Sequence, residues 1–516
     1  RKTGNWIPPF GNRMNAGTNA IWTLSEPFGS SDWFPCKNVP SDKADSSDVW
    51  ITCADNFTAV SNGLLKEVVP GVGTKTYKWH NSYPIANYLI SIAVTNYSQY
   101  DGWFKYSSAD SMPVNHFIYP ENLTRIKPLL DKTIDMLKFY SNTYGLYPFV
   151  KEKYGHAEFG QLGGMEHQTC SSMGYWSEDI IAHELTHQWF GDKITCKDWH
   201  HIWLNEGFAT YGEALYEEYA RGKIAYDGFM LHEMNNAKNA VGSIYVQNVE
   251  SVSAIFDAAR SYSKGGTVLH MLRNVIRDSL YFASIKKYVS DTTLAYKSAV
   301  TEDFQRNVQQ VSGQSLNYFF SEWIYGENYP KYSVSMSASD AGNRLYNVSV
   351  KIEQAINTNP AFFTMPVDIK FFLFDSDTTF TVFNNAQTQT FNFLLKEKPA
   401  AFKIDPNKKI LCKITGDEPI TPVSFELSQN YPNPFNPSTT ITYQVLRSSD
   451  IKLKIYNTLG QEIRSYFFAN QKDGRYKILF DAFGLASGTY FYTLTAADTK
   501  SGELLFSESK SMQLIK

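Results

Sequence analysis

The sequence predicts a multidomain α+β protein in which one mostly helical region lies between β regions. Three observations support this fold class. The chain has 516 residues, which is longer than a single hydrophobic core of typical size allows. Residues 120–330 carry apolar side chains at helical spacing, whereas the regions on either side alternate between apolar and polar in short runs. Clusters of Gly, Pro, Asn and Ser separate those runs, as expected between antiparallel strands.

The composition excludes several classes of protein. The 48 basic and 51 acidic residues leave a net charge of -3, so the chain offers no basic surface for nucleic acid. Apolar residues make up 43% of the chain, which is typical of a globular protein and not of a disordered one. The longest uncharged apolar stretches, such as residues 89–94, are far shorter than the roughly 20 residues of a transmembrane helix.

The five cysteines do not form the framework of a disulfide-rich domain, because they are few and odd in number. Cys36 with Cys53, and Cys170 with Cys196, are close enough in sequence to form two local bridges. Isolated buried thiols are the alternative, because a sequence does not give the distance between Cα atoms that a bridge requires.

The predicted N-terminal antiparallel β domain covers residues 1–119, with β-type runs at residues 49–52, 76–79, 88–95 and 116–119. The predicted mostly α domain covers residues 120–330. Its first apolar periodicity extends from Asn122 to Tyr140 and is closed by Gly145. Further helices are predicted at residues 177–190, 205–221, 264–278 and 315–325.

Apolar and polar residues alternate again after Pro330, which predicts a second β domain at residues 331–416. Its strands are expected near residues 332–336, 348–352, 371–374 and 380–383. A Pro-bearing linker follows at residues 417–423, and a small β module covers residues 424–516. The module has predicted strands at residues 451–456 and 490–495, with turns at residues 458–460 and 472–474.

The strongest chemical signal is the string HELTH at residues 183–187, inside the helix that Ser177 is expected to cap. Residues four apart share one helix face, so His183 and His187 reach the same metal ion. Glu184 stands about 100° from His183 around the helix and faces the open coordination position of that ion. This pattern predicts a hydrolytic zinc site, and two unrelated surface histidines are the alternative.

A catalytic zinc ion needs a third protein ligand, for which Glu206 is the candidate. It lies in the apolar segment WLNEGFA at residues 203–209, which begins a second predicted helix able to pack antiparallel to the first. An acidic side chain in an apolar segment requires a charged partner, which zinc supplies. A glutamate that merely favours a helix N-terminus is the alternative. We expect one Zn2+ per chain.

With HELTHQWFGD at residues 183–192 and WLNEGFA behind it, the chain resembles the gluzincin aminopeptidases, the family of aminopeptidase N and of the leukotriene hydrolase. The resemblance covers about residues 20–415 and is strongest at residues 139–266. It implies an N-terminal β domain, a thermolysin-like catalytic domain and a β-sandwich domain. It also implies that the N-terminal domain is truncated at its start, because this domain is shorter than that of the family.

The segment GGMEH at residues 163–167 resembles the family's GAMEN exopeptidase motif. By this resemblance Glu166 holds the free α-amino group of the substrate, and its neighbours bind the substrate beside it. A carboxylate at a fixed distance from the metal limits attack to the first peptide bond. Gly164 replaces the alanine of the motif and His167 replaces its asparagine, so we expect His167 to change a contact with the substrate. An ordinary Gly-rich edge strand is the alternative. The predicted substrate-binding residues are Gly163, Gly164, Met165, Glu166 and His167.

The segment RSYSKGG at residues 260–266 resembles the family's tyrosine and Lys-Gly motif. By this resemblance the Tyr262 phenol donates a hydrogen bond to the oxyanion that forms during hydrolysis. Without the resemblance Tyr262 is one of 33 tyrosines, and packing in the core is the simpler interpretation.

The C-terminal string FELSQNYPNPFNPSTT at residues 425–440, with IYNTLGQE and LASGTYFY behind it, resembles the sorting domain of the type IX secretion system. This resemblance implies a bacterial protein that the type IX machinery exports and that is secreted or attached to the cell surface. An ordinary β-sandwich appendage is the alternative.

Together these features predict a zinc-dependent aminopeptidase acting on peptide N-termini, with Glu184 as general base and Tyr262 as oxyanion donor. Neither nucleic-acid binding nor a transmembrane segment is expected. The alternatives are a zinc endopeptidase, which would cleave N-acetylated peptides, and a surface peptide-binding protein with weakened catalysis. A lipid-epoxide hydrolase, an activity known in the family, is a further alternative. The preferred first residue of the substrate and the oligomeric state do not follow from the sequence.

Overall fold

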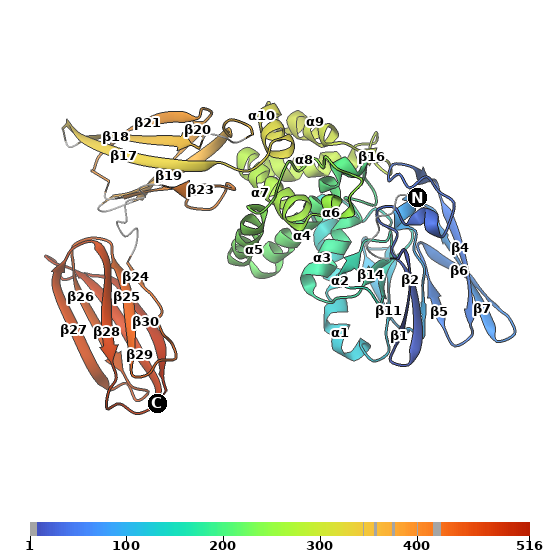
Figure 1. The fold of residues 1–516 in the computed structure, drawn as a ribbon, viewed down its shortest axis with the longest axis horizontal. Helices are drawn as coiled ribbons and strands as arrows, with labels where there is room; N and C mark the ends of the chain where they lie inside the picture. The colour runs from blue at the N-terminus through green and yellow to red at the C-terminus, as the bar shows by residue number, and fades with distance from the viewer. Residues whose placement is uncertain are drawn as a thin grey trace. The chain divides into compact units, whose positions relative to one another are not determined.

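The structure is a computed structural model that describes residues 8–343, 345–355, 359–373, 377–399, 401–415 and 425–515 (Figure 1). It contains two compact units. The first unit contains the described residues up to Tyr329 together with residues 359–364 and 408–411, and the second contains the remaining described residues. The expected order of a β region, a helical region and two further β regions is confirmed. The predicted domain boundaries stay a prediction, and the linker expected at residues 417–423 lies outside the described residues.

The chain before residue 98 forms three small antiparallel sheets, with strand orders β1-β2-β9-β5, β4-β7-β6 and β3-β8. The predicted runs at residues 49–52 and 76–79 lie within two of these strands. The strands are β1 (Phe10–Asn15), β2 (Thr18–Thr23), β3 (Lys43–Ala44), β4 (Ser47–Ala54), β5 (Thr58–Val60), β6 (Leu64–Pro70), β7 (Thr74–Asn81), β8 (Ile85–Ala86) and β9 (Ala93–Thr95).

The continuous strand predicted at residues 88–95 is wrong. Residues 87–89 form a 3-10 turn, and only Ala93–Thr95 pair as a strand. The Asn62 side chain explains the interruption, because it donates to the Leu89 carbonyl at 2.9 Å and accepts from the Ser91 amide at 2.8 Å. These backbone groups are satisfied by a side chain and need no neighbouring strand.

A five-stranded sheet of order β10-β11-β12-β14-β13 supports the site described below. Strand β11 pairs in parallel with β12, with Val114 opposite Tyr154, so strands from both sides of the predicted boundary at residue 119 share this sheet. Strand β13 lies at one edge and pairs only with β14. The strands are β10 (Ser98–Lys105), β11 (Ser111–Ile118), β12 (Tyr154–Glu158), β13 (Gly164–Met165) and β14 (Ser171–Met173).

Each predicted helix is present, two of them with a difference in form, and the region contains four further helices that were not predicted, at residues 223–237, 252–255, 278–290 and 301–312. The first predicted helix is divided into α1 and α2, and the helix expected at residues 315–325 continues after α10 as a π-helical turn at Ser321–Tyr325. A short parallel pair, β15 (Thr195–Cys196) with β16 (Ser298–Ala299), also lies in this region. The helices are α1 (Leu123–Leu130), α2 (Thr133–Tyr144), α3 (Glu178–His187), α4 (Trp203–Arg221), α5 (Lys223–Ala237), α6 (Val252–Ile255), α7 (Gly265–Ile276), α8 (Asp278–Ser290), α9 (Thr301–Ser312) and α10 (Asn317–Phe320).

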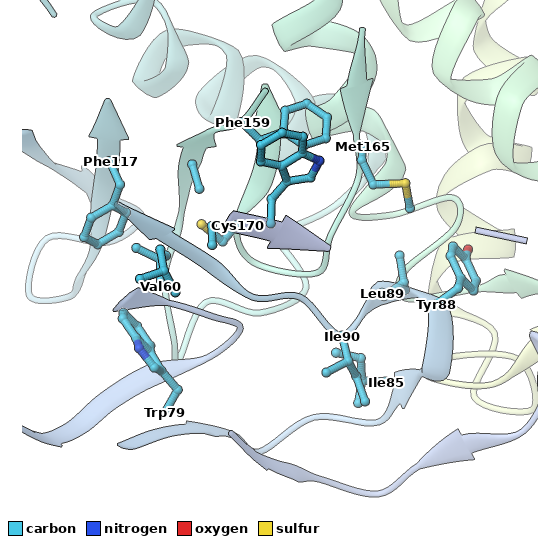
Figure 2. Close-up of a cluster of buried hydrophobic side chains, with 14 of the residues drawn as sticks. Val60, Trp79, Ile85, Tyr88, Leu89, Ile90, Phe117, Phe159, Met165 and Cys170 are labelled. Carbon is cyan, nitrogen blue, oxygen red and sulfur yellow. The ribbon is translucent and has the colours of Figure 1, made fainter. Parts of the chain in front are cut away.

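One hydrophobic core connects the N-terminal strands to the strand that carries the GGMEH segment. Figure 2 shows Val60, Trp79 and Phe117 in the same cluster as Phe159 and Met165. The Met165 side chain is 3% exposed, so burial of this thioether fixes the backbone on which Glu166 stands. The N-terminal strands therefore take part in positioning the site residues of the helical region.

The second unit contains two β-sandwiches. In the first, Phe371 of β19 contacts Phe393 of β21 from the opposite sheet, with ring centroids 5.0 Å apart. Its strands are β17 (Lys331–Gly342), β18 (Leu345–Gln354), β19 (Met365–Phe372), β20 (Asp377–Asn384), β21 (Thr388–Leu395), β22 (Ala401–Ile404) and β23 (Lys413–Thr415). These agree with the predicted strands, except that the run predicted at residues 371–374 ends at Phe372, and residue 374 lies outside the described residues.

The C-terminal sandwich pairs a sheet of order β24-β25-β28 with one of order β27-β26-β29-β30. Buried residues of both sheets, including Tyr443 and Tyr492, share one core. The predicted strands at residues 451–456 and 490–495 lie within β26 and β29. The strands are β24 (Glu426–Leu427), β25 (Ser438–Val445), β26 (Ser449–Tyr456), β27 (Glu462–Gln471), β28 (Gly474–Asp481), β29 (Gly488–Asp498) and β30 (Leu504–Leu514).

Two further expectations concern the whole chain. All five cysteines are free thiols, so the local bridges considered for Cys36 with Cys53 and for Cys170 with Cys196 do not form. Cys53 instead lies against the Phe57 carbonyl. Across the described ranges, none of the helices combines the length and the apolar character that a membrane crossing requires.

Candidate metal centre and substrate cleft

Helices α3 and α4 bring three metal-ligating side chains together. Ser177 caps α3 as predicted, because its hydroxyl accepts a hydrogen bond from the Ile180 amide at 3.2 Å. The two helices approach closely because Gly212 of α4 has no side chain, and a Cβ there would lie 2.2 Å from Thr186 Oγ1. As a result, Glu206 Oε2 lies 3.3 Å from His183 Nε2 and 3.4 Å from His187 Nε2.

These three residues fit a metal ion. One ligand atom from each of His183, His187 and Glu206 lies within 4.8 Å of the others. The outer ring nitrogens are occupied, since His183 Nδ1 donates to Glu213 Oε1 at 2.7 Å and His187 Nδ1 donates to the Phe190 carbonyl at 3.1 Å. With each Nδ1 held as a donor, Nε2 is the nitrogen of each ring that can lose its proton and face a metal ion. Two imidazoles and one carboxylate form the ligand set of a hydrolytic zinc site.

The charge state of Glu206 also suits a ligand. Burial alone would raise its pKa, but His187 and His183 beside it lower the pKa to about 2. The carboxylate is therefore ionised at neutral pH. The structure brings together the three predicted ligands, and their coordination of zinc stays a prediction.

Glu213 is a site residue that the sequence interpretation missed. It lies on α4 two turns after Glu206, and its hydrogen bond orients the His183 ring. The side chains of both partners are mostly buried, at 16% and 13% exposure, so water competes little for this bond. The helical spacing of seven residues, which puts Glu206 and Glu213 on one face, was the available signal.

Glu184 lies beside the candidate ligands, and one of its carboxylate oxygens is within 4.8 Å of a ring nitrogen of His187. Its side chain is buried, and its Oε2 has no hydrogen-bond partner in the described part of the chain. Strand β13 passes directly over this carboxylate, since a Cβ on Gly164 would lie 2.2 Å from Glu184 Oε1. Burial raises the pKa of Glu184 to about 8, which is the range of a base that accepts a proton near neutral pH.

Two buried carboxylates converge beside the candidate metal ligands. Ligand atoms of Glu26, Glu166 and Glu206 lie within 4.8 Å of one another. Oε1 of Glu26 and Oε1 of Glu166 have no hydrogen-bond partner among the residues that the structure describes. Burial raises the pKa of both carboxyl groups, and their mutual repulsion contributes to the raised pKa of Glu26. Paired acceptors without donors form a site for a cation such as an ammonium group.

Glu26 is the second residue that the sequence interpretation missed. It precedes Glu166 by 140 positions and lies in the N-terminal β region. No spacing rule connects such distant residues. The only signal was an acidic residue among apolar neighbours in LSEPF at residues 24–28.

His167 lies outside the cleft, although we expected it to contact the substrate. Its side chain is completely buried, and its Nδ1 lies 2.8 Å from the hydroxyl of Ser172 on β14. Burial lowers the pKa of His167 to about 3, so the imidazole stays neutral. The histidine thus fastens the turn after β13 to β14, while the other four residues of the segment line the cleft.

Tyr262 lies beside the candidate ligands on a π-helical turn at Ala258–Lys264. Its ring stacks on the His183 ring with centroids 6.0 Å apart and planes 16° apart. The following helix α7 approaches α4 closely, because a Cβ on Gly207 would lie 2.9 Å from Gly265 Cα. Burial raises the pKa of Tyr262 well above its usual range, so the phenol keeps its proton and serves as a donor.

The candidate ligands line one cleft of about 460 Å³ together with Glu26, Glu166, Glu184, Glu213 and Tyr262. The cleft follows helix α3. Glu166 lies at the His187 end of this helix, where Gln188 Nε2 donates to the Glu166 carbonyl at 3.3 Å. Tyr175, Ser177, Asp179 and Ile180 line the opposite end. The cleft can therefore hold an extended ligand with a cation at one end and the candidate metal ligands near its middle.

Comparisons with known proteins match the region of the chain that contains this site. Residues 129–323 match the peptidase family M1 domain, and residues 429–505 match the secretion system C-terminal sorting domain. The first match contains both helices of the candidate metal centre, the GGMEH segment and Tyr262. Glu26 lies outside it.

Similar curated proteins include aminopeptidases of animals and plants. Aminopeptidase A of Gloydius brevicauda is 26% identical over 348 residues, which cover 61% of this chain and 35% of that protein. Aminopeptidase M1 of Arabidopsis thaliana is 27% identical over 349 residues, which cover 62% of this chain and 38% of that protein. The chain thus spans less than half the length of these relatives.

Two solved structures are similar in fold. The first is Legionella pneumophila aminopeptidase A in complex with aspartic acid, with a TM-score of 0.70, 18% identity, and coverage of 80% of this chain and 49% of that chain. The second is a mutant of an M1 zinc metallopeptidase from Deinococcus radiodurans bound to a Tyr-Ser-Ala substrate. Its TM-score is 0.55 at 25% identity, with coverage of 64% of this chain and 74% of that chain. The comparisons therefore relate residues 129–323 to the peptidase family M1 domain and residues 429–505 to the secretion system C-terminal sorting domain.

Proposed function

We propose that the protein is a zinc-dependent aminopeptidase that hydrolyses the first peptide bond of peptides with a free N-terminus. One observation carries this proposal. Glu26 Oε1 and Glu166 Oε1 have no hydrogen-bond partner in the described structure, and ligand atoms of both residues lie within 4.8 Å of a ligand atom of Glu206, a candidate metal ligand. A substrate amine held by these carboxylates has its own carbonyl group next to the metal position. Several similar proteins are named aminopeptidases, which supports the same activity here.

His183, His187 and Glu206 would hold the zinc ion. Such an ion polarises the scissile carbonyl and lowers the pKa of a water molecule next to it. Glu213 keeps the His183 ring in the orientation and tautomer that ligation requires. The Phe190 carbonyl does the same for His187.

Glu184 would accept the proton of the attacking water and pass it to the leaving amine. Its carboxylate lines the cleft next to the metal ligands, and its Oε2 is available for this task. Tyr262 would donate a hydrogen bond to the oxygen on which negative charge develops, because its protonated phenol lines the same cleft. These two residues are the proposed catalytic residues.

Glu26 and Glu166 would position the substrate. A protonated amine satisfies both buried carboxylates, whereas an acetylated nitrogen carries no charge and leaves them unpaired in a desolvated site. The cleft therefore favours free N-termini over blocked ones, and an internal peptide bond has no amine to bind there. This selection would make the enzyme an exopeptidase.

The sorting domain indicates a bacterial protein that is secreted or located at the cell surface. We propose that the type IX secretion machinery engages the module at residues 424–516. The substrates would accordingly be peptides outside the cell.

The test combines metal analysis with two substrate sets. We expect about one zinc per chain, cleavage of aminoacyl amides with a free amine, no cleavage of their N-acetylated counterparts, and loss of activity on chelation. Glu184→Gln should retain zinc and lose about 10²–10⁴-fold in kcat. Glu67→Gln is the matched control, because Glu67 lies on the exposed strand β6. Cleavage of the acetylated set, or full turnover by Glu184→Gln, would contradict the proposal.

A further inference from the structure

We propose that Gln188 is a positioning residue that fixes the distance between the amine-binding carboxylate of Glu166 and the metal position. The inference rests on the proposed aminopeptidase function and deepens it, because this distance decides which class of amine the enzyme accepts. Gln188 does not line the cleft. It acts through the turn that carries Glu166 and takes no part in the chemical step.

The backbone of Gln188 belongs to the helix that carries the candidate metal ligands. Gln188 directly follows His187 and is the C-cap of α3, where its amide donates to the Leu185 carbonyl at 3.1 Å. Its side chain is completely buried, so packing restricts it to one conformation. The side-chain amide of Gln188 therefore has a fixed position relative to His187.

This side-chain amide holds both ends of the turn after β13. Nε2 of Gln188 donates to the Glu166 carbonyl at 3.3 Å, and Oε1 accepts from the Thr169 amide at 2.9 Å. The Tyr147 hydroxyl lies 3.1 Å from the same Oε1, and the Asp192 carboxyl group lies beside the amide. A primary amide donates and accepts at once, so one side chain connects the helix to a carbonyl and an N–H of the turn.

The backbone of the turn is strained at the residue that Gln188 holds. Thr169 has a φ of 66°, in the left-handed region that a β-branched residue rarely adopts. Its hydroxyl accepts from the Gly63 amide at 2.8 Å and lies 3.4 Å from Lys153 Nζ. Such a conformation persists only where the surrounding contacts hold it. Among these contacts, Gln188 provides the one from the metal-binding helix.

The other contacts of the segment connect it to the sheet and the core. Met165 is buried in the hydrophobic cluster of Figure 2, and the His167 ring forms a hydrogen bond with Ser172 of β14. These contacts place the turn relative to the strands. Its place relative to the candidate metal ligands depends on Gln188.

The distance from Glu166 to the metal position selects the class of amine. In an α-amino acid one carbon separates the amine from the scissile carbonyl, whereas in a β-amino acid two carbons do. The additional carbon–carbon bond is about 1.5 Å long, and a displacement of about 1 Å at a reacting group can lower the rate by about 100-fold. A turn that Gln188 holds in place therefore accepts α-amino acids and discriminates against β-amino acids.

The test compares the p-nitroanilides of glycine and β-alanine, which differ by one methylene group. We expect kcat/KM of the zinc-loaded enzyme to be about 100-fold higher for the glycine substrate. Gln188→Met keeps the length and loses the hydrogen bonds, and Gln188→Asn keeps the amide but ends one methylene short of the turn. Each should reduce the ratio by about tenfold or more. Because the ratio is measured within one protein sample, it does not depend on the folded fraction or the zinc content.

Gln168→Met is the matched control. Gln168 is as completely buried as Gln188 and lies in the same turn, but its Nε2 donates to Asn81 Oδ1 at 3.0 Å. The control therefore introduces the same substitution beside the site without removing a contact to the metal-binding helix. We expect it to keep the wild-type ratio.

The outcomes separate the two proposals. Cleavage of both substrates at comparable rates by the wild type would keep the aminopeptidase function and overturn the role of Gln188. A wild-type ratio in the Gln188 variants, or an equal fall of the ratio in Gln168→Met, would also overturn this role. Cleavage of neither substrate by the wild type would overturn the proposed function and the inference with it.

Discussion

Replacing Glu213 with glutamine should weaken zinc binding without unfolding the site. The Glu213 carboxylate does not itself belong to the candidate ligand set. It accepts a hydrogen bond from His183 Nδ1 at 2.7 Å and thereby increases the electron density on the Nε2 atom that faces the metal. Glutamine has the same shape and can keep an acceptor there, but it lacks the negative charge.

The expected size of the effect follows from the burial of this pair. A hydrogen bond to a charged group contributes about 1.5–3 kcal/mol, whereas one between neutral groups contributes about 0.5–1.5 kcal/mol. The difference of about 1–2 kcal/mol corresponds to a 5- to 30-fold weaker affinity for zinc. Glu213→Ala also removes the acceptor and leaves a cavity, so its loss should approach 100-fold.

The assay is competition for zinc with a chelator of known affinity, measured on the folded protein by circular dichroism and metal analysis. Glu217→Gln is the control, because Glu217 lies one turn further along α4 and pairs with Arg221 instead of a histidine. An unchanged zinc affinity in both Glu213 variants would refute the reasoning, because it would show that the carboxylate neither orients nor polarises His183.

Three further predictions concern other residues. Tyr262→Phe should lower kcat by about 10²–10³-fold with little change in KM or zinc content; a change below threefold in steady-state kinetics would remove the phenol from the mechanism. Glu26→Gln should raise KM for free-amine substrates by tenfold or more, because one of two charges facing the ammonium group is lost; an unchanged KM would show that Glu166 binds the amine alone. Acid should destabilise the fold through the buried pair His116 and His156, whose Nδ1 atoms are 2.9 Å apart. Burial lowers the pKa of His116 to about 4 and that of His156 well below its usual range, so the unfolded chain binds protons that the folded chain does not. The free energy of unfolding in urea should therefore fall from pH 6.5 toward pH 4, by about 1.4 kcal/mol per pH unit for each histidine, and identical urea curves at pH 7 and pH 5 would contradict this.

The residues that the sequence placed correctly are those whose geometry is local. The relation between His183, Glu184 and His187 depends only on helical periodicity, and the hydroxyl of Ser177 begins that helix as its residue type predicts. To place Glu206 beside the two histidines, the prediction needed one tertiary contact, which is the packing of α3 against α4. The close approach of these helices depends on Gly212, which has no recognisable spacing signal.

The residues that the sequence did not indicate depend on tertiary structure. Glu26 reaches the site only because the N-terminal strands and the GGMEH segment share one core (Figure 2). His167 faces away from the cleft for two reasons. Met165, two residues earlier, is buried in that core, and the His167 ring forms a hydrogen bond with the Ser172 hydroxyl. The π-helical turn of Tyr262 inserts a residue into the helical hydrogen-bond pattern, and this has no signature in apolar periodicity.

The accumulation of acidic groups in the cleft is itself an argument for its function. Glu26, Glu166 and Glu206 have ligand atoms within 4.8 Å of one another. At an effective dielectric constant of 20, each such pair of charges repels by about 3 kcal/mol, and three pairs together would match the whole stability of a typical domain. Protonation relieves part of this repulsion, as the raised pKa values of Glu26 and Glu166 indicate. A divalent cation and a substrate ammonium group bring three positive charges to the same place. A neutral ligand brings none, so the electrostatics of the cleft favour a metal and an N-terminal amine together.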